Sequence, residues 1–335
     1  MNIRKPKIIK QTAAKLLHRS PQRGHIMLVY CGIVLVQCAV ITALNYLVDH
    51  QLGQAGGLGN LGTRTLLSTF AMVLPILHTL ALIVLDVGLY NAMLRISRGQ
   101  YTSGQSLRMG LSRFWGVFGC TAFRLLTCLA VGFASLNISV LIYTMTPFFG
   151  RVVDMLQPML NSTADPTVIV NELLASEVIA AEYVRATLPL YFIFAAVALV
   201  LLVPLIYRLR FSELVLIDNP RFGGFRACLE SYRLTRRQWT PMLKLDFSFW
   251  WYHVLTMVAG MLCYADLFAP LLGISLPWSA EVSGLVFYGL YLVTQVLIYY
   301  FLRPRLEVSK SLIYNALLPK EEPTQGVVLG NIFQM

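Results

Sequence analysis

Long apolar runs separated by short polar segments dominate the chain. A helix that crosses a bilayer needs about 20 consecutive, mostly apolar residues. Six runs reach this length, at about 26–48, 66–93, 115–145, 187–207, 245–268 and 281–302. The pattern predicts an all-α polytopic membrane protein with six transmembrane helices. Pro75 lies inside the second run, where it should kink the helix or mark a tightly packed site.

The composition agrees with this pattern over the whole length of the chain. Of the 335 residues, 57% are hydrophobic and only 13% are charged, and the mean hydropathy is +0.65. An average soluble domain carries about 25% charged residues. The net charge of +11 would also suit nucleic acid, but the basic residues alternate with bilayer-length runs. We therefore expect anionic membrane lipids as partners and no nucleic acid.

The basic residues are distributed unevenly between the two sides of the predicted bundle. On one side, seven precede residue 26, four lie in 94–114, eight in 208–244 and four after residue 302. The loops on the other side carry Arg64, Arg151 and Arg185. Loops rich in lysine and arginine stay in the cytoplasm. We therefore expect a bacterial inner-membrane protein with both termini cytoplasmic.

Amphipathic segments adjoin the spans on the predicted cytoplasmic side. Residues 1–25 form a basic amphipathic helix that should lie on the anionic surface, and residues 303–335 form a cytoplasmic tail. In 225–239, Phe225, Leu229 and Tyr232 recur at helical spacing, opposite an arginine stripe. The first inner loop, 95–115, is likewise predicted to contain a basic amphipathic helix. These segments supply the candidate ligands for anionic lipid headgroups, which are Arg95, Arg98, Arg108, Arg226, Arg233, Arg236 and Arg237.

Several of these stretches resemble one bacterial integral-membrane family. The matching features of the second inner loop are Asp218-Asn219-Pro220, Ser231, Arg236-Arg237 and FSFWWY at 247–252. Two further matches are GLYNAMLRISRGQ at 88–100 and RPRLEVSKSLIYNAL at 303–317. In these features the chain is similar to the family catalogued as domain of unknown function 975. That family is related in layout to the membrane domains of some glycerophosphodiester phosphodiesterases. The resemblance implies a six-helix inner-membrane protein of unestablished activity.

Four ionisable residues fall inside predicted spans, where such groups are functional candidates by default. They are His78, Asp86, Arg124 and His253. Asp86 and Arg124 lie at matched depth on spans joined by a short loop, so we expect them to pair. One interpretation is a polar site for an anionic headgroup or a coupled ion. The other is a structural ion pair, beside histidines whose hydrogen bonds are made by neighbouring groups.

No motif in the sequence indicates enzymatic chemistry. Nucleophile elbows, zinc-protease helices and phosphate-binding loops are missing, and the six cysteines lack metal-ligand spacing. We therefore expect no catalytic residue, no metal and no cofactor. The leading interpretation is a non-enzymatic protein that is associated with lipid or accessory to transport. A small secondary transporter and a membrane-embedded enzyme of lipid metabolism are the alternatives. A protein partner or a homo-oligomer is left open.

Overall fold

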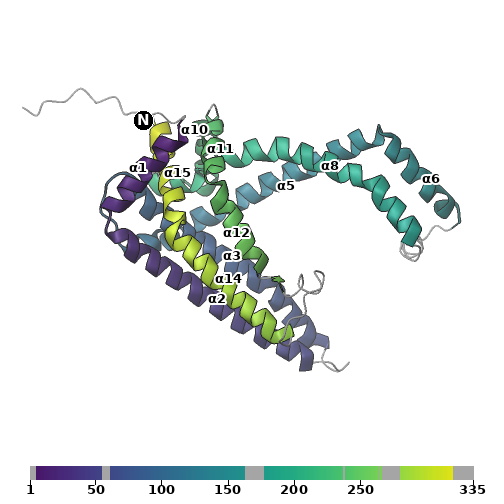
Figure 1. Ribbon diagram of the computed structural model, residues 1–335, viewed down its shortest axis with the longest axis horizontal. Helices are drawn as coiled ribbons and strands as arrows, with labels where there is room; N and C mark the ends of the chain where they lie inside the picture. Colours follow the sequence, from purple (N-terminus) through teal and green to yellow (C-terminus); the bar gives the residue numbers. More distant parts are fainter. Residues whose placement is uncertain are drawn as a thin grey trace, which may run out of the picture. The chain divides into compact units, whose positions relative to one another are not determined.

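The computed structural model describes residues 5–54, 61–162, 177–236, 238–262, 264–265 and 280–319. Every regular element in these parts of the chain is a helix, so the all-α class is confirmed. The helices form two compact units (Figure 1). Residues 1–119 and 211–335 make the first unit, and residues 120–210 make the second.

Five described helices are long and apolar enough to cross a membrane, as the class predicted from the sequence requires. They cover Gln22–Val48, Thr65–Ser97, Phe114–Thr144, Ala181–Asp218 and Val282–Phe301. The sixth predicted span, 245–268, is interrupted at Phe249, between α11 (Trp239–Ser248) and α12 (Trp250–Leu262). The 13 residues of α12 are fewer than a crossing requires. The segment continues beyond the described residues, so a sixth span stays a prediction.

Three long helices form the apolar part of the first unit. They are α2 (Gln22–Gln54), α3 (Leu61–Ser97) and α14 (Ala280–Phe301). Helix α2 packs against both α3 and α14, and α12 packs against α14, as Figure 1 shows. These helices are apolar around most of their circumference, which suits helices that face lipid on their outer side.

The two halves of helix α3 have different surroundings. Leu66, Met72 and Ile76 are exposed in its first half, whereas Leu89 and Met93 are fully buried in its second half. The enclosing helices are α1 (Pro6–Arg19), α9 (Ser212–Asp218) and α15 (Arg303–Leu317). We call these helices, together with α10 (Gly224–Thr235), α11 and the second half of α3, the end cluster. Only the first half of α3 can therefore face lipid along most of its surface.

The segment predicted to be a cytoplasmic tail begins with the most enclosed helix of the end cluster. Helix α15 packs against α1, α3 and α14. Its buried residues are Arg303, Pro304, Leu306, Glu307, Val308, Ser309, Ser311, Leu312, Ile313 and Tyr314. Because most of its circumference is covered, α15 is a core element of the unit. Residues 320–335 of the predicted tail lie outside the described residues.

The N-terminal amphipathic helix exists, but protein covers its apolar side. Helix α1 buries Ile9, Ala13 and Leu17, and it contacts α15, α3 and α11. The ammonium group of Lys10 donates a hydrogen bond to the carbonyl of Ser248 and lies 4.3 Å from the ring centroid of Phe249. The apolar side of α1 thus packs against the other helices of the end cluster. The sequence predicted that this side lies on lipid, but the packing covers it.

The first inner loop folds back along α3 in two short helices, η2 (Gly104–Arg108) and α4 (Met109–Ser112). Two glycines make this close packing possible. A Cβ atom at Gly88 would lie 2.2 Å from the carbonyl oxygen of Leu107, and one at Gly110 would lie 1.8 Å from that of Val84. The Asn91 amide also donates a hydrogen bond of 3.2 Å to the Ser106 carbonyl. The loop is therefore fixed against α3.

The second unit is formed by most of α5 (Phe114–Thr144), by α6 (Pro147–Ser162) and by α8 (Glu177–Arg208). Helix α6 packs against α8. The hydroxyl group of Tyr143 donates a hydrogen bond of 2.9 Å to the carbonyl of Ala186. This bond joins the end of α5 to the first turns of α8.

Candidate functional site

A buried ion pair connects three helices of the first unit. Arg303 of α15 lies with its Nη2 2.7 Å from Oδ2 of Asp86 on α3. Tyr30 of α2 donates its hydroxyl hydrogen to Oδ1 of Asp86 at 2.6 Å. Arg303 also donates a hydrogen bond to the Tyr30 oxygen. Both carboxylate oxygens of Asp86 therefore have partners, and we call these three residues the Asp86 triad.

The surroundings of the Asp86 triad favour a permanent cation. The Arg303 side chain is 9% exposed and that of Asp86 is 25% exposed. The guanidinium carbon of Arg303 lies 5.2 Å from the ring centroid of Tyr30 and 4.8 Å from that of Tyr299. Aromatic faces attract a cation, most strongly where water is excluded. A guanidinium in this place holds the helices together and has no proton to exchange at ordinary pH.

A second ion pair lies within the end cluster. Arg98 binds Asp218 with two parallel hydrogen bonds, Nη1 to Oδ1 at 2.7 Å and Nη2 to Oδ2 at 2.6 Å. Its Nε donates to the Asn315 side-chain oxygen at 3.0 Å, and the Asn315 amide donates to the Ser97 hydroxyl at 2.9 Å. The bonds to Asp218 raise the pKa of the Arg98 guanidinium above its usual value. The end of α3, the end of α9 and α15 are thereby joined.

Of the four ionisable residues predicted inside the spans, Asp86 has its partner within the first unit. Asp86 binds Arg303, which lies in the segment predicted to be a cytoplasmic tail. His78 is half-buried on α3, and His253 is exposed on α12, where its ring meets the edge of Tyr252. Arg124 is half-buried in the second unit. A pair between Asp86 and Arg124 would join the two units and stays a prediction.

Most of the arginines predicted to bind headgroups are exposed. They are Arg95, Arg98, Arg108, Arg226, Arg233 and Arg236. Arg233 reaches Glu230 at 3.2 Å, and Arg226 lies 4.3 Å from the ring centroid of Phe222. The two partners, Glu230 and Phe222, lie on the same or the adjoining segment, and these contacts leave the arginines at the surface.

Two of the predicted headgroup arginines differ from the rest. Arg98 has three of its nitrogens bound by Asp218 and Asn315, so its expected role as a lipid ligand is not supported. Arg237 lies outside the described residues.

Sequence reasoning missed Tyr30, Arg303 and Asp218 as partners in the two ion pairs. Tyr30 was one aromatic residue in an apolar run, and Arg303 was one of many basic residues that follow a span. One signal was present: Arg303 is followed by Pro304, a residue typical of the first turn of a helix. That signal predicts a helix in the tail, though not its burial.

The described residues hold no group of three histidine, cysteine, aspartate or glutamate side chains placed to bind a metal ion. The arrangement consists instead of saturated ion pairs, with apolar and basic surfaces around them. Comparison of the chain with family models, with curated proteins and with solved structures finds no match. The resemblance to the integral-membrane family therefore stays a prediction, and the function must be argued from the geometry alone.

Proposed function

We propose that this chain is a multi-pass protein of the bacterial inner membrane that binds anionic lipids with its cytoplasmic face and has no enzymatic activity of its own. The observation that carries the proposal is the orientation of α10. This helix buries small residues, namely Gly224, Ala227, Cys228, Ser231 and Thr235. Its large apolar residues point outward, with Phe225 57% exposed and Leu229 40% exposed.

The inward side of α10 is fixed by packing and hydrogen bonding. The Ser231 hydroxyl oxygen accepts a hydrogen bond of 3.1 Å from the backbone N–H of Phe211, at the start of α9. A Cβ atom at Gly119 would lie 3.7 Å from the Cα of Gly224, so the start of α10 also lies close to α5. Because small residues form this contact, the helix cannot turn Phe225 inward without losing it.

The outward side of α10 combines apolar and basic groups. Arg226, Arg233 and Arg236 are exposed along the same helix and its end. A surface that presents aromatic and aliphatic groups beside arginines suits the boundary between lipid headgroups and acyl chains. Each lysine or arginine near an anionic leaflet contributes about 1 kcal/mol of attraction. The exposed side of α10 is thus suited to anionic lipid.

Two tryptophans support a lipid boundary at the same end of the unit. Trp115 is 81% exposed in the first turn of α5, and Trp250 is 62% exposed in the first turn of α12. Tryptophan is enriched where a membrane meets water, because its ring is apolar and its N–H is polar. The excess of basic residues on this side of the chain supports a cytoplasmic orientation for it.

The transporter alternative has less support. A coupling site needs an ionisable group that can bind and release an ion, and both oxygens of Asp86 are engaged by Arg303 and Tyr30.

The proposal can be tested with a fluorophore on a single cysteine in the full-length protein. The six native cysteines are replaced, Leu229→Cys is labelled, and the protein is reconstituted in vesicles that contain spin-labelled phosphatidylglycerol. The label at residue 229 should be quenched, and more strongly than with spin-labelled phosphatidylcholine.

A label on Lys15→Cys provides the matched control, because Lys15 is exposed on a helix whose apolar side is already covered by protein. It should be quenched less than the label at 229. Equal quenching at both positions, or none at 229, would refute the proposal.

A further inference from the structure

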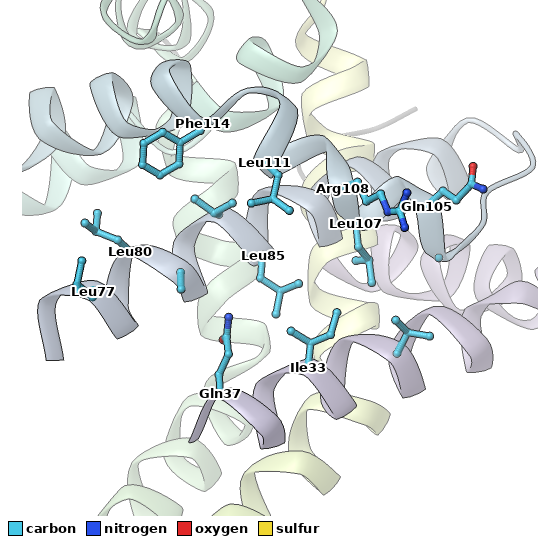
Figure 2. A pocket seen from close by; sticks show the side chains of 14 residues that line it. Ile33, Gln37, Leu77, Leu80, Leu85, Gln105, Leu107, Arg108, Leu111 and Phe114 are labelled. Atoms are coloured by element: carbon cyan, nitrogen blue, oxygen red, sulfur yellow. The ribbon is translucent and has the colours of Figure 1, made fainter. Parts of the chain in front are cut away.

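An apolar groove of about 700 Å³ opens on the first unit beside the first inner loop. Figure 2 shows its walls: α2 with Ile33 and Gln37, α3 with Leu77 to Leu85, and the η2–α4 segment with Leu107 and Leu111. All the lining residues belong to the same compact unit. A volume of this size is within the range that binds small organic ligands in proteins, about 300–1,000 Å³.

The groove is held open by the surrounding packing. One wall is the η2–α4 segment, which Gly88 and Gly110 allow to lie directly on the backbone of α3. The opposite wall is α2, whose Tyr30 is bonded to Asp86 of α3. Neither wall can close on the other without breaking these contacts. The groove is therefore a preformed site.

The chemistry of the lining is strongly asymmetric. Gln105 and Arg108 lie at one end of the groove, and Leu77 and Leu80 lie toward the other, as Figure 2 shows. The lining holds no carboxylate, and the remaining polar side chain is Gln37 on the α2 wall. Arg108 is exposed, and a guanidinium can bind two oxygens of a phosphate group at once. The ligand that fits has an anionic head and an apolar body.

We propose that this groove binds one anionic phospholipid, with its phosphate at Arg108 and an acyl chain between α2 and α3. The inference rests on the proposed lipid-binding function and adds to it a defined site with a stated ligand class. Position along the helices supports it: Leu77 lies in the half of α3 that is exposed to its surroundings, and Leu85 lies at the edge of the enclosed half. The head end of the groove thus adjoins the end cluster, and the chain end adjoins the apolar helices.

The test uses phosphatidylglycerol that carries a photoactivatable diazirine in its acyl chain. The full-length protein is reconstituted in phosphatidylcholine vesicles with a minor fraction of this probe, irradiated and digested. Cross-links should concentrate in peptides that contain residues 77–85 and 104–114. A phosphatidylcholine probe with the same chain should label these peptides less.

Two variants and one control give the test its specificity. Arg108→Gln should reduce labelling of the groove peptides about fivefold, the loss expected for one arginine at an anionic surface. Ala81→Phe should abolish it by filling the groove between α2 and α3. Arg305→Gln removes the same charge from an exposed site on α15 that does not line the groove, and it should leave this labelling unchanged. Melting temperatures measured alongside identify any variant that fails to fold.

Labelling spread evenly over the apolar helices would overturn the inference, as would an Arg108→Gln variant that behaves like Arg305→Gln. This failure is separable from failure of the proposed function. If the groove is empty but the α10 surface binds lipid, the label at residue 229 is quenched as before while the groove peptides stay unlabelled. If both readouts fail, the lipid-binding function itself is refuted.

Discussion

Loss of the charge at Asp86 should destabilise the protein more than any exposed substitution, because it strands a buried guanidinium. In Asp86→Asn, Arg303 keeps its position between the rings of Tyr30 and Tyr299 but loses its counter-charge. Removing one partner of a buried ion pair costs about 3–5 kcal/mol. The contacts with the aromatic rings compensate in part, at about 0.5–2 kcal/mol. We therefore expect a net loss of about 1–4.5 kcal/mol.

Substitution of Arg303 should reduce the stability less than substitution of Asp86, because the two members of the pair differ in their surroundings. In Arg303→Met, the carboxylate of Asp86 keeps the hydrogen bond from Tyr30 and is partly accessible, with 25% of its side chain exposed. The double variant Asp86→Asn/Arg303→Met leaves no charge in the cluster. Its loss should be smaller than the sum of the two single losses, and smaller than that of Asp86→Asn alone.

The assay is thermal unfolding of the purified protein in detergent, followed by intrinsic fluorescence. In a chain of this size each kcal/mol corresponds to roughly 2 °C in Tm, so Asp86→Asn should lower Tm by about 2–9 °C. Arg305→Met is the matched control, since Arg305 is exposed two residues along the same helix. Additive losses in the double variant would show that the two residues do not interact. The same cycle run with Arg124→Met would reveal a pair across the two units if one exists.

Three further predictions test the packing, the second ion pair and the orientation. Gly110→Ala should lower Tm by several degrees, because its Cβ would meet the Val84 carbonyl oxygen at 1.8 Å. The control Gly132→Ala, whose Cβ would have nothing within 4 Å, should leave Tm unchanged or raise it. Equal effects of the two substitutions would contradict the close packing of the first loop. Arg98→Gln and Asp218→Asn should each reduce Tm, and their double variant should lose no more than the worse single variant; a change in lipid preference with Arg98→Gln would mean that this side chain is available to headgroups after all. At residue 225, a fused reporter that is active in the cytoplasm should give a signal, and one that is active in the periplasm should not. A periplasmic signal there would reverse the proposed orientation.

The sequence by itself determined the class of the protein, most of its long helices and the exposure of most of its basic residues. The physical reason is that these properties are local. A run of apolar residues long enough to cross a bilayer can satisfy its backbone there only as a helix, whatever its neighbours are. Arg226 and Arg233 are exposed, as the arginine stripe of the second inner loop predicted, but Phe225 and Leu229 of the apolar stripe are exposed beside them. The break at Phe249 escaped this reasoning, because the aromatic residues on either side read as one continuous apolar run.

The tertiary structure decided which charges meet and which surfaces are covered. Arg303 and Tyr30 are 273 residues apart in the chain, and Arg98 and Asp218 are 120 apart. No periodicity links positions at such separations, since they come together only when helices that are distant in the chain pack side by side. The same packing encloses α15 and covers the apolar side of α1, although both segments have the composition of surface helices. The groove beside Arg108 likewise exists only because Gly88 and Gly110 allow a loop to lie against the backbone of α3.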